Sequence, residues 1–126
     1  MGNRGGRRAW RMRRGEIRLV DLDPSRGAEA NKRRPAVIVS NDGANSAAER
    51  LGRGVITVVP VTSNTDHIYP FQVLFPAPTC GLDRASKAQA EQVRSVAVER
   101  IGSRIGALPP ELLSGLNEAL RLHLAL

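Results

Sequence analysis

Short runs of β-branched and apolar residues, separated by turn residues, constrain the fold of this chain most. Residues 55–61 are the clearest strand, and residues 36–40 and 71–75 are shorter ones bounded by proline. Residues 16–22 alternate partly in polarity, and residues 86–100 favour short strands broken by a turn, extended by residues 104–108. A brief helix is expected at residues 44–51, where Gly52 ends it.

One amphipathic helix closes the sequence. Pro109-Pro110 precedes Glu111, an order typical of a helix start, and leucines recur afterwards at helical spacing: Leu113, Leu116, Leu120 and Leu124. Strands followed by a helix argue against a parallel α/β sheet. The sequence therefore predicts a mainly β fold: a small, strongly bent, largely antiparallel sheet or barrel closed by a C-terminal helix.

The basic charge is concentrated at the N-terminus. The net charge is +7, and residues 1–14 hold six arginines and no acid, so that the remainder carries only +1. A Gly/Arg-rich arm at residues 1–11 has too little apolar surface to offset its ordering entropy, and we expect it to be disordered. It would contact phosphate backbones without reading sequence, serve only as a solubilising extension, or be upstream sequence ahead of a native start at Met12.

Several kinds of site are excluded or disfavoured. The chain has one cysteine, Cys80, and two histidines, which cannot form a usual four-ligand zinc site. Neither a phosphate-binding Walker loop nor a dinucleotide fingerprint is present. A magnesium site at Asp21 and Asp23 is disfavoured, since turn initiation explains Asp23. With no apolar run long enough to span a membrane, we expect a cytoplasmic protein without cofactor or metal.

A guanidinium and a hydroxyl are predicted to meet at one end of the sheet. Arg34 leads into the strand at 36–40, and Thr62 follows the strand at 55–61. If these strands are neighbours, the planar fork of Arg34 and the O–H of Thr62 suit a phosphate. A solvated strand entry and ordinary turn chemistry explain the same residues equally simply.

Five segments in order resemble the MazF/PemK (Kid) family of toxins. They are residues 15–24, residues 27–40 with Glu29 and the run Arg34-Pro35-Ala36-Val37, residues 59–63, residues 69–73, and residues 90–95. Each motif is weak alone, but their order covers residues 12–126, which we interpret as a single toxin domain.

The resemblance implies an SH3-like small barrel of the CcdB/MazF type, a homodimer, and a cognate MazE-like antitoxin as partner. It implies metal-independent endoribonuclease cleavage of single-stranded RNA, which inhibits translation and growth. Carried over residue by residue, Arg34 and Thr62 form the catalytic pair, and Glu29 is the nearby candidate base. The RNA-binding candidates are Arg33, Ser63, Asn64, Gln72, Gln92 and Ser95. Because aromatic residues are scarce, we expect hydrogen bonds rather than stacking to read the bases.

Two features depart from the family, and three rival functions stay open. Many members have Trp where this chain has Arg18, and the arm at residues 1–11 has no counterpart. The rivals are a CcdB-like toxin that binds DNA gyrase without catalysis, a nucleic-acid-binding module without cleavage, and an inactive homologue kept for antitoxin binding.

Overall fold

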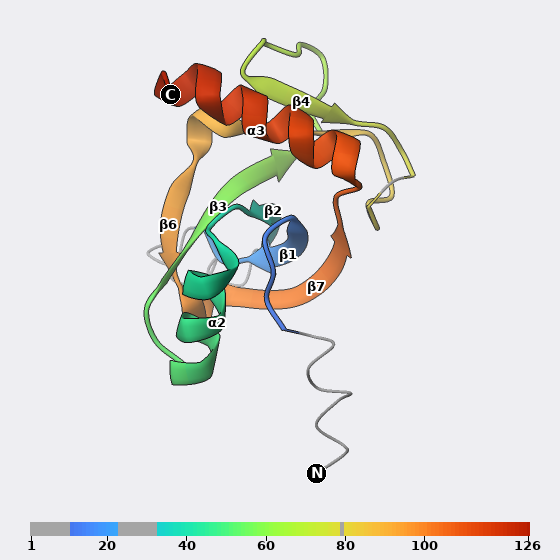
Figure 1. The fold of residues 1–126 in the computed structure, drawn as a ribbon. Coiled ribbons are helices and arrows are strands. Elements are labelled where there is room, and N and C mark those ends of the chain that lie inside the picture. Colours follow the sequence, from blue (N-terminus) through green and yellow to red (C-terminus); the bar gives the residue numbers. More distant parts are fainter. Residues whose placement is uncertain (1–10, 23–32, 79) are drawn as a thin grey trace.

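The computed structural model describes residues 11–22, 33–78 and 80–126, whose strands form one seven-stranded antiparallel sheet (Figure 1). The path of neighbours is β4-β5-β3-β2-β1-β7, and β6 pairs with β3 beside this path. The strands are β1 (Glu16–Val20), β2 (Arg34–Ile38), β3 (Val55–Thr62), β4 (Gln72–Phe75), β5 (Ser86–Gln89), β6 (Arg94–Ala97) and β7 (Ile101–Ala107).

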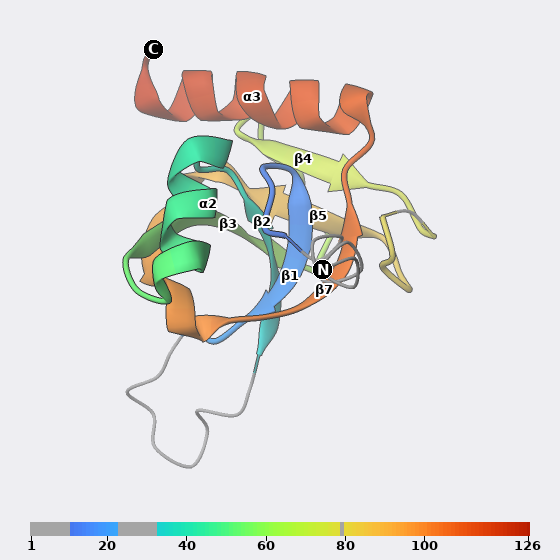
Figure 2. The ribbon, with the colours of Figure 1, turned by 60° about the horizontal axis from the view of Figure 1, so that its bottom comes forward.

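The strand β3 bends the sheet because its partners change along its length. Its first half, Val55 to Val58, pairs with β6 on one side, whereas Val61 and Thr62 pair with β5 on that side. On the other side, residues 58–60 pair with β2. Register shifts within the β1–β7 pair add to the curvature, and the strands wrap around as Figure 2 shows.

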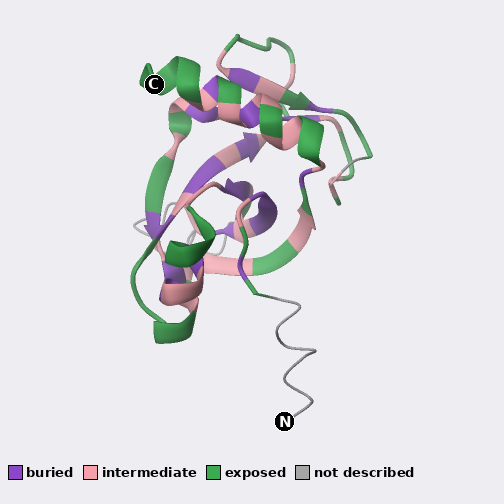
Figure 3. Ribbon diagram, in the orientation of Figure 1, coloured by how far each residue is buried: buried purple, intermediate pink, exposed green. Residues whose placement is uncertain are grey.

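Two helices flank the sheet. The helix α2 (Asp42–Leu51) begins at Asn41, whose side-chain oxygen accepts from the Ala44 N–H at 2.8 Å, and ends at Gly52 with φ +70°. The helix α3 (Pro110–Leu124) lies across one end of the sheet, with exposed residues along its outer side (Figure 3).

The apolar core has two parts. Beneath α3, the buried residues Leu116 and Ala119 pack with Val37, Val59 and Phe75. The second part lies among β1, β2, β3, β6 and α2; its members include Val20, Ile38, Ala48, Ile56 and Val96. Aliphatic side chains fill both parts except for Phe75, as the composition requires.

Arg18, which departs from the family pattern, lies in a buried ion cluster. The Glu16 carboxylate accepts from Arg18 Nε at 3.1 Å and from Arg104 Nε at 3.0 Å. Glu16 and Arg18 are 5% and 8% exposed, and Arg18 also donates to the Gly102 carbonyl. The guanidinium is therefore tolerated at this position because paired charges offset its desolvation.

The predicted fold class is confirmed, with shifts at element ends. The helix expected at 44–51 begins at Asp42, and two 3₁₀ turns, η2 (Ala90–Gln92) and η3 (Val98–Arg100), separate β5, β6 and β7. Leu124, predicted on the buried face of α3, is 47% exposed. Most of the turn and loop at 23–34 and of the basic arm lies outside the described residues. In the described part of the chain, no helix is long and apolar enough to cross a membrane.

Candidate functional site

Arg34 and Thr62 meet at one end of the β2–β3 pair. The register aligns Ala36 with Pro60 and Val37 with Val59, so continuing it by two residues places Arg34 opposite Thr62. Both residues line one cleft of about 280 Å³. Neighbouring strands thus bring together the guanidinium and the hydroxyl that the sequence paired. No ion pair to Arg34 occurs within the described part of the chain.

The hydroxyl of Thr62 is oriented by the turn that follows β3. Its oxygen accepts from the Asn64 backbone N–H at 3.2 Å, a local turn typical of threonine. A hydroxyl that accepts in this way still has its own proton to donate. Thr62 can therefore act as a donor toward an anion in the cleft.

The segment between β4 and β5 supplies the opposite wall, which the sequence did not indicate. Leu82, Asp83 and Arg84 line the cleft together with Ser86 and Ser63. Arg84 adds a second guanidinium, and Asp83 adds a carboxylate. Only the tertiary fold brings them to Arg34, because some 50 residues separate them in the sequence.

Close backbone packing fixes this wall. Gly81 (φ +85°) and Gly106 on β7 allow the chain at Cys80 and Gly81 to lie against Ile105 and Gly106. A methyl group on Gly106 would be 2.6 Å from the Cys80 carbonyl carbon, and one on Gly81 would be 3.0 Å from that of Ile105. Both glycines are thus required by the close approach. Burial raises the pKa of the Cys80 thiol by desolvation.

The other predicted site residues take different places. Ser63 lines the cleft, and Asn64 is exposed just beyond it, whereas Glu29 lies outside the described residues. Arg33 is exposed, and its guanidinium lies against Gly102 of β7, on the side away from Thr62.

The predicted glutamines and Ser95 do not line the cleft. Gln72 is 8% exposed; its amide donates to Glu91 at 2.8 Å and accepts from the Tyr69 N–H at 3.1 Å, so it holds the chain together. Gln92 and Ser95 are exposed. Ser95 pairs with Thr57 on β3, five residues and roughly 17 Å along the strand from Thr62.

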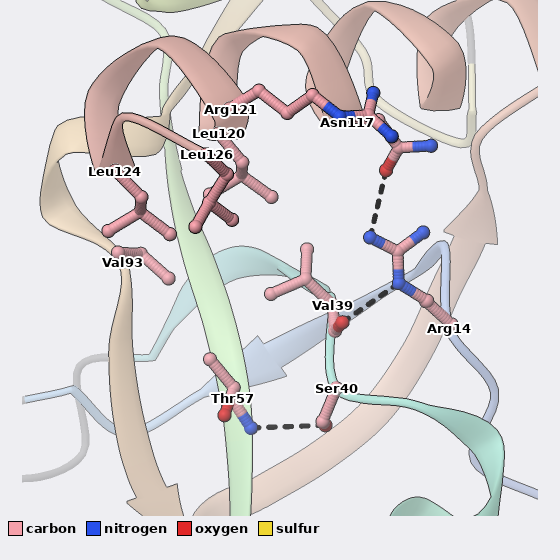
Figure 4. A pocket seen from close by; sticks show the side chains of 10 residues that line it. All are labelled: Arg14, Val39, Ser40, Thr57, Val93, Asn117, Leu120, Arg121, Leu124 and Leu126. Atoms are coloured by element: carbon pink, nitrogen blue, oxygen red, sulfur yellow. Dashed lines mark hydrogen bonds between the residues drawn. The ribbon is translucent and has the colours of Figure 1, made fainter.

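A second, more apolar cavity of about 450 Å³ lies between α3 and the middle of the sheet (Figure 4). C-terminal leucines and Val39 form its apolar side. Arg14 crosses its polar side and donates to Asn117 and to the Val39 carbonyl, both at 2.8 Å. None of the sequence-predicted site residues lines it. The smaller cleft, with its two guanidinium groups and the Thr62 hydroxyl, is the one suited to phosphate chemistry. Over residues 11–22, 33–78 and 80–126, no three His, Cys, Asp or Glu side chains form a metal-binding group.

Comparison with known proteins identifies the family of this chain. Residues 13–124 match the family described as PemK-like, MazF-like toxin of type II toxin–antitoxin system. The chain is 64% identical over 115 residues to Endoribonuclease MazF9 of Mycobacterium tuberculosis, which covers 91% of this chain and 98% of that protein. It is 29% identical over 115 residues to Endoribonuclease EndoA of Bacillus subtilis, covering 91% and 96%.

Solved structures show the same fold. An endoribonuclease from a mycobacterial species superposes with a TM-score of 0.71 at 22% identity and covers 92% of this chain and 93% of its own. A second, described as an endoribonuclease in complex with its cognate antitoxin, gives 0.69 at 23% identity and covers 91% and 96%. The relatives named as endoribonucleases confirm the predicted enzyme class. The chain therefore belongs to the PemK/MazF family of toxins from type II toxin–antitoxin systems, a family that includes these endoribonucleases.

Proposed function

We propose that this toxin cuts single-stranded RNA without a metal ion, using the 2′-hydroxyl of the RNA as the nucleophile and the Arg34–Thr62 cleft as the site of cleavage. The observation that carries the proposal is the placement of Arg34 opposite Thr62 in a cleft that also holds Arg84. Two guanidinium groups beside one cleft suit the charge that develops on a phosphate during in-line attack.

In this mechanism the 2′-oxygen attacks the adjacent phosphorus and loses its proton to a base. The bond from phosphorus to the 5′-oxygen breaks, and that oxygen gains a proton. The products are a 2′,3′-cyclic phosphate and a 5′-hydroxyl. Arg34 is not the base, because a guanidinium does not lose its proton in proteins. It binds the phosphate oxygens, and Thr62 donates to one of them or relays a proton to the leaving oxygen.

Glu29 remains our candidate for the base. Its position before Arg34 in the sequence motivates the assignment. A solvated glutamate, with a pKa of about 4.3, is a weak base, so Glu29→Gln tests the role directly. The assignment requires slower cleavage in this variant with unchanged binding of RNA. Cleavage at the wild-type rate would assign the proton to another group.

Residues at two distances from the scissile phosphate are proposed to contact the RNA. Ser63 and Asn64 adjoin Thr62 and suit the nucleotides at the cut. Gln92 and Ser95 suit only flanking nucleotides, because Ser95 lies several residues along β3 from Thr62. Arg33 suits a backbone phosphate on the β7 side. Gln72 is left out because its amide already bonds within the protein.

The decisive experiment is cleavage of a long single-stranded RNA in EDTA, with cut positions mapped by primer extension. We compare the wild type with Arg34→Ala and with Arg53→Ala, which removes another exposed arginine, one outside the cleft. Loss of one such donor costs about 10²–10³ in rate. We expect discrete cuts in the wild type and the Arg53 control that fall to this extent in Arg34→Ala. Equal cutting by all three proteins would remove Arg34 from the mechanism, and no cutting at all would point to a toxin that only binds its target, such as gyrase.

The partners we propose are a second copy of the chain and a MazE-like antitoxin, acting in the cytoplasm. The solved relative described as a complex with its cognate antitoxin supports the second partner. Leu122 near the end of α3 and Leu126 just beyond it are 58% and 84% exposed, and contact with a second copy of the chain would cover such apolar side chains. Light scattering after gel filtration gives the mass and hence the oligomeric state. An acidic antitoxin segment should bind less tightly as salt rises, because salt screens exposed charges.

A further inference from the structure

Three aromatic rings gather on the surface between β3 and β4. The rings of His67 and Tyr69 are 4.2 Å apart between centroids, tilted by 48°, and those of Tyr69 and Phe71 are 5.4 Å apart and nearly parallel. Tyr69 takes part in both contacts yet remains 46% exposed, and His67 is exposed as well. We call these three residues the ring row. The chain has only four Phe, Tyr and Trp residues, and two of them, Tyr69 and Phe71, belong to the ring row. Apolar ring surface left in water here is unfavourable for folding.

Lys87 anchors the loop that carries the ring row. This lysine is 8% exposed; its Nζ donates to the His67 carbonyl at 2.7 Å and lies 5.9 Å from the centroid of the Tyr69 ring. No carboxylate pairs with it in the described part of the chain. Gln72 fixes the other side of the loop by bonding the Tyr69 backbone. The rings therefore sit on an anchored loop.

The ring row adjoins the cleft through the same lysine. Lys87 on β5 is the cross-strand partner of Thr62 on β3, and such partners project from the same face of the sheet. A row of neighbours thus runs from Arg34 through Thr62 and Lys87 to Tyr69. The Lys87 charge, without an acidic partner in the described chain, favours a polyanion beside the rings.

We propose that the ring row, held by Lys87, is a nucleobase-stacking site next to the cleft, which takes one base of the RNA strand while the cleft takes the phosphate. This rests on the proposed function. Single-stranded RNA presents unstacked bases that aromatic side chains receive, and the Lys87 charge near the Tyr69 ring favours a negatively charged strand there. The scarcity of aromatic residues in the whole sequence argued against stacking, but the fold concentrates them at the place where stacking is useful.

The test is binding of an RNA that cannot be cut. An oligonucleotide spanning a mapped cut carries a 2′-O-methyl group in place of the attacking hydroxyl, and its Kd is measured by fluorescence anisotropy. If the wild type cuts nothing, short random-sequence RNA is the probe. Tyr69→Ala should weaken binding roughly 5- to 100-fold, the usual loss for one stacked base. Tyr69→Phe, which keeps the ring, should bind within about twofold of the wild type.

An abasic scan shows whether the loss arises from stacking. Removing the base at one position should weaken binding to the wild type but not to Tyr69→Ala, since the two changes delete the same contact. The loss of affinity caused by the missing base at that position should also be smaller in Lys87→Met. It should return to its wild-type size in Lys87→Arg. Tyr69→Ala binding as tightly as the wild type would overturn the proposal. So would an abasic penalty that is equal in both proteins at every position. If the wild type cuts RNA but Tyr69→Ala binds it as tightly as the wild type does, the stacking site is wrong and the proposed function stands. If the wild type cuts no RNA at all, the proposed function is wrong.

Discussion

A single methyl group on Gly106 should open the cleft by separating two backbones. Gly106 lies on β7 against the carbonyl of Cys80, and the added carbon would be 2.6 Å from the Cys80 carbonyl carbon and 3.2 Å from the Gly81 nitrogen. Carbon atoms pack best at about 3.5–4.0 Å. The two segments must therefore move apart by about 1 Å, since neither contact involves a flexible side chain.

The expected magnitude follows from this displacement. Forcing an extra methyl group into a packed site costs about 1–3 kcal/mol, which lowers Tm by roughly 3–6 °C for each kcal/mol in a domain of this size. Because Leu82, Asp83 and Arg84 follow directly and form the cleft wall, cleavage should fall as well. A displacement of about 1 Å can cost on the order of 10²-fold in rate.

The assay is urea unfolding of Gly106→Ala beside cleavage at saturating RNA. The control is Gly115→Ala in α3, where the new carbon would be 3.7 Å from Val73 Cγ1, an ordinary contact. The two variants should shift the free energy of unfolding in opposite directions. Wild-type stability and wild-type cleavage in Gly106→Ala would refute the idea that this contact fixes the wall of the cleft.

Three further outcomes follow from the structure. Gly115→Ala should raise the free energy of unfolding by about 0.5–1 kcal/mol in urea titration, because alanine suits a helix interior better than glycine. Glu16→Gln should lower it by about 3 kcal/mol, because Arg18 and Arg104 lose their shared counter-charge in a buried setting; an unchanged midpoint would mean that the cluster adds no stability. Burial raises the pKa of the Cys80 thiol, so that less thiolate is present at a given pH. Iodoacetamide should therefore alkylate Cys80 more slowly than it alkylates glutathione at pH 8. The rate of Cys80 alkylation should rise with pH, with a midpoint at higher pH than that of glutathione.

The fold was predictable from the sequence wherever an element leaves a local pattern of apolar residues. The β-branched run that became β3 and the leucines of α3 follow directly from residue spacing. One turn was expected within residues 86–100, whereas the structure has two 3₁₀ turns there, η2 and η3, because a turn of three residues leaves no periodic signal. The buried Arg18 is likewise invisible in sequence, since only tertiary pairing with Glu16 makes its burial tolerable.

The candidate site was predictable only in part, for a related reason. Arg34 and Thr62 end two neighbouring antiparallel strands, so strand order alone brings them together. Arg84 reaches the cleft through a close backbone approach at Gly81, which no pattern of residue types indicates. Gln72 was predicted to bind RNA, but its amide bonds to Glu91 within the protein. The sequence alone does not show this contact.

The arrangement separates the chemistry of cleavage from the choice of sequence. Arg34 and Thr62 stand on strands whose backbones are fixed by ladder hydrogen bonds, and positions on strands hold a reacting geometry more closely than positions on loops. Ser63, Asn64 and the ring row at Tyr69, by contrast, lie on the loop that follows β3. Loops tolerate substitution without disturbing the core. Changing the rings should therefore alter which RNA is bound while the cleft keeps the same reaction, whereas changing β2 or β3 should abolish cleavage of every sequence alike.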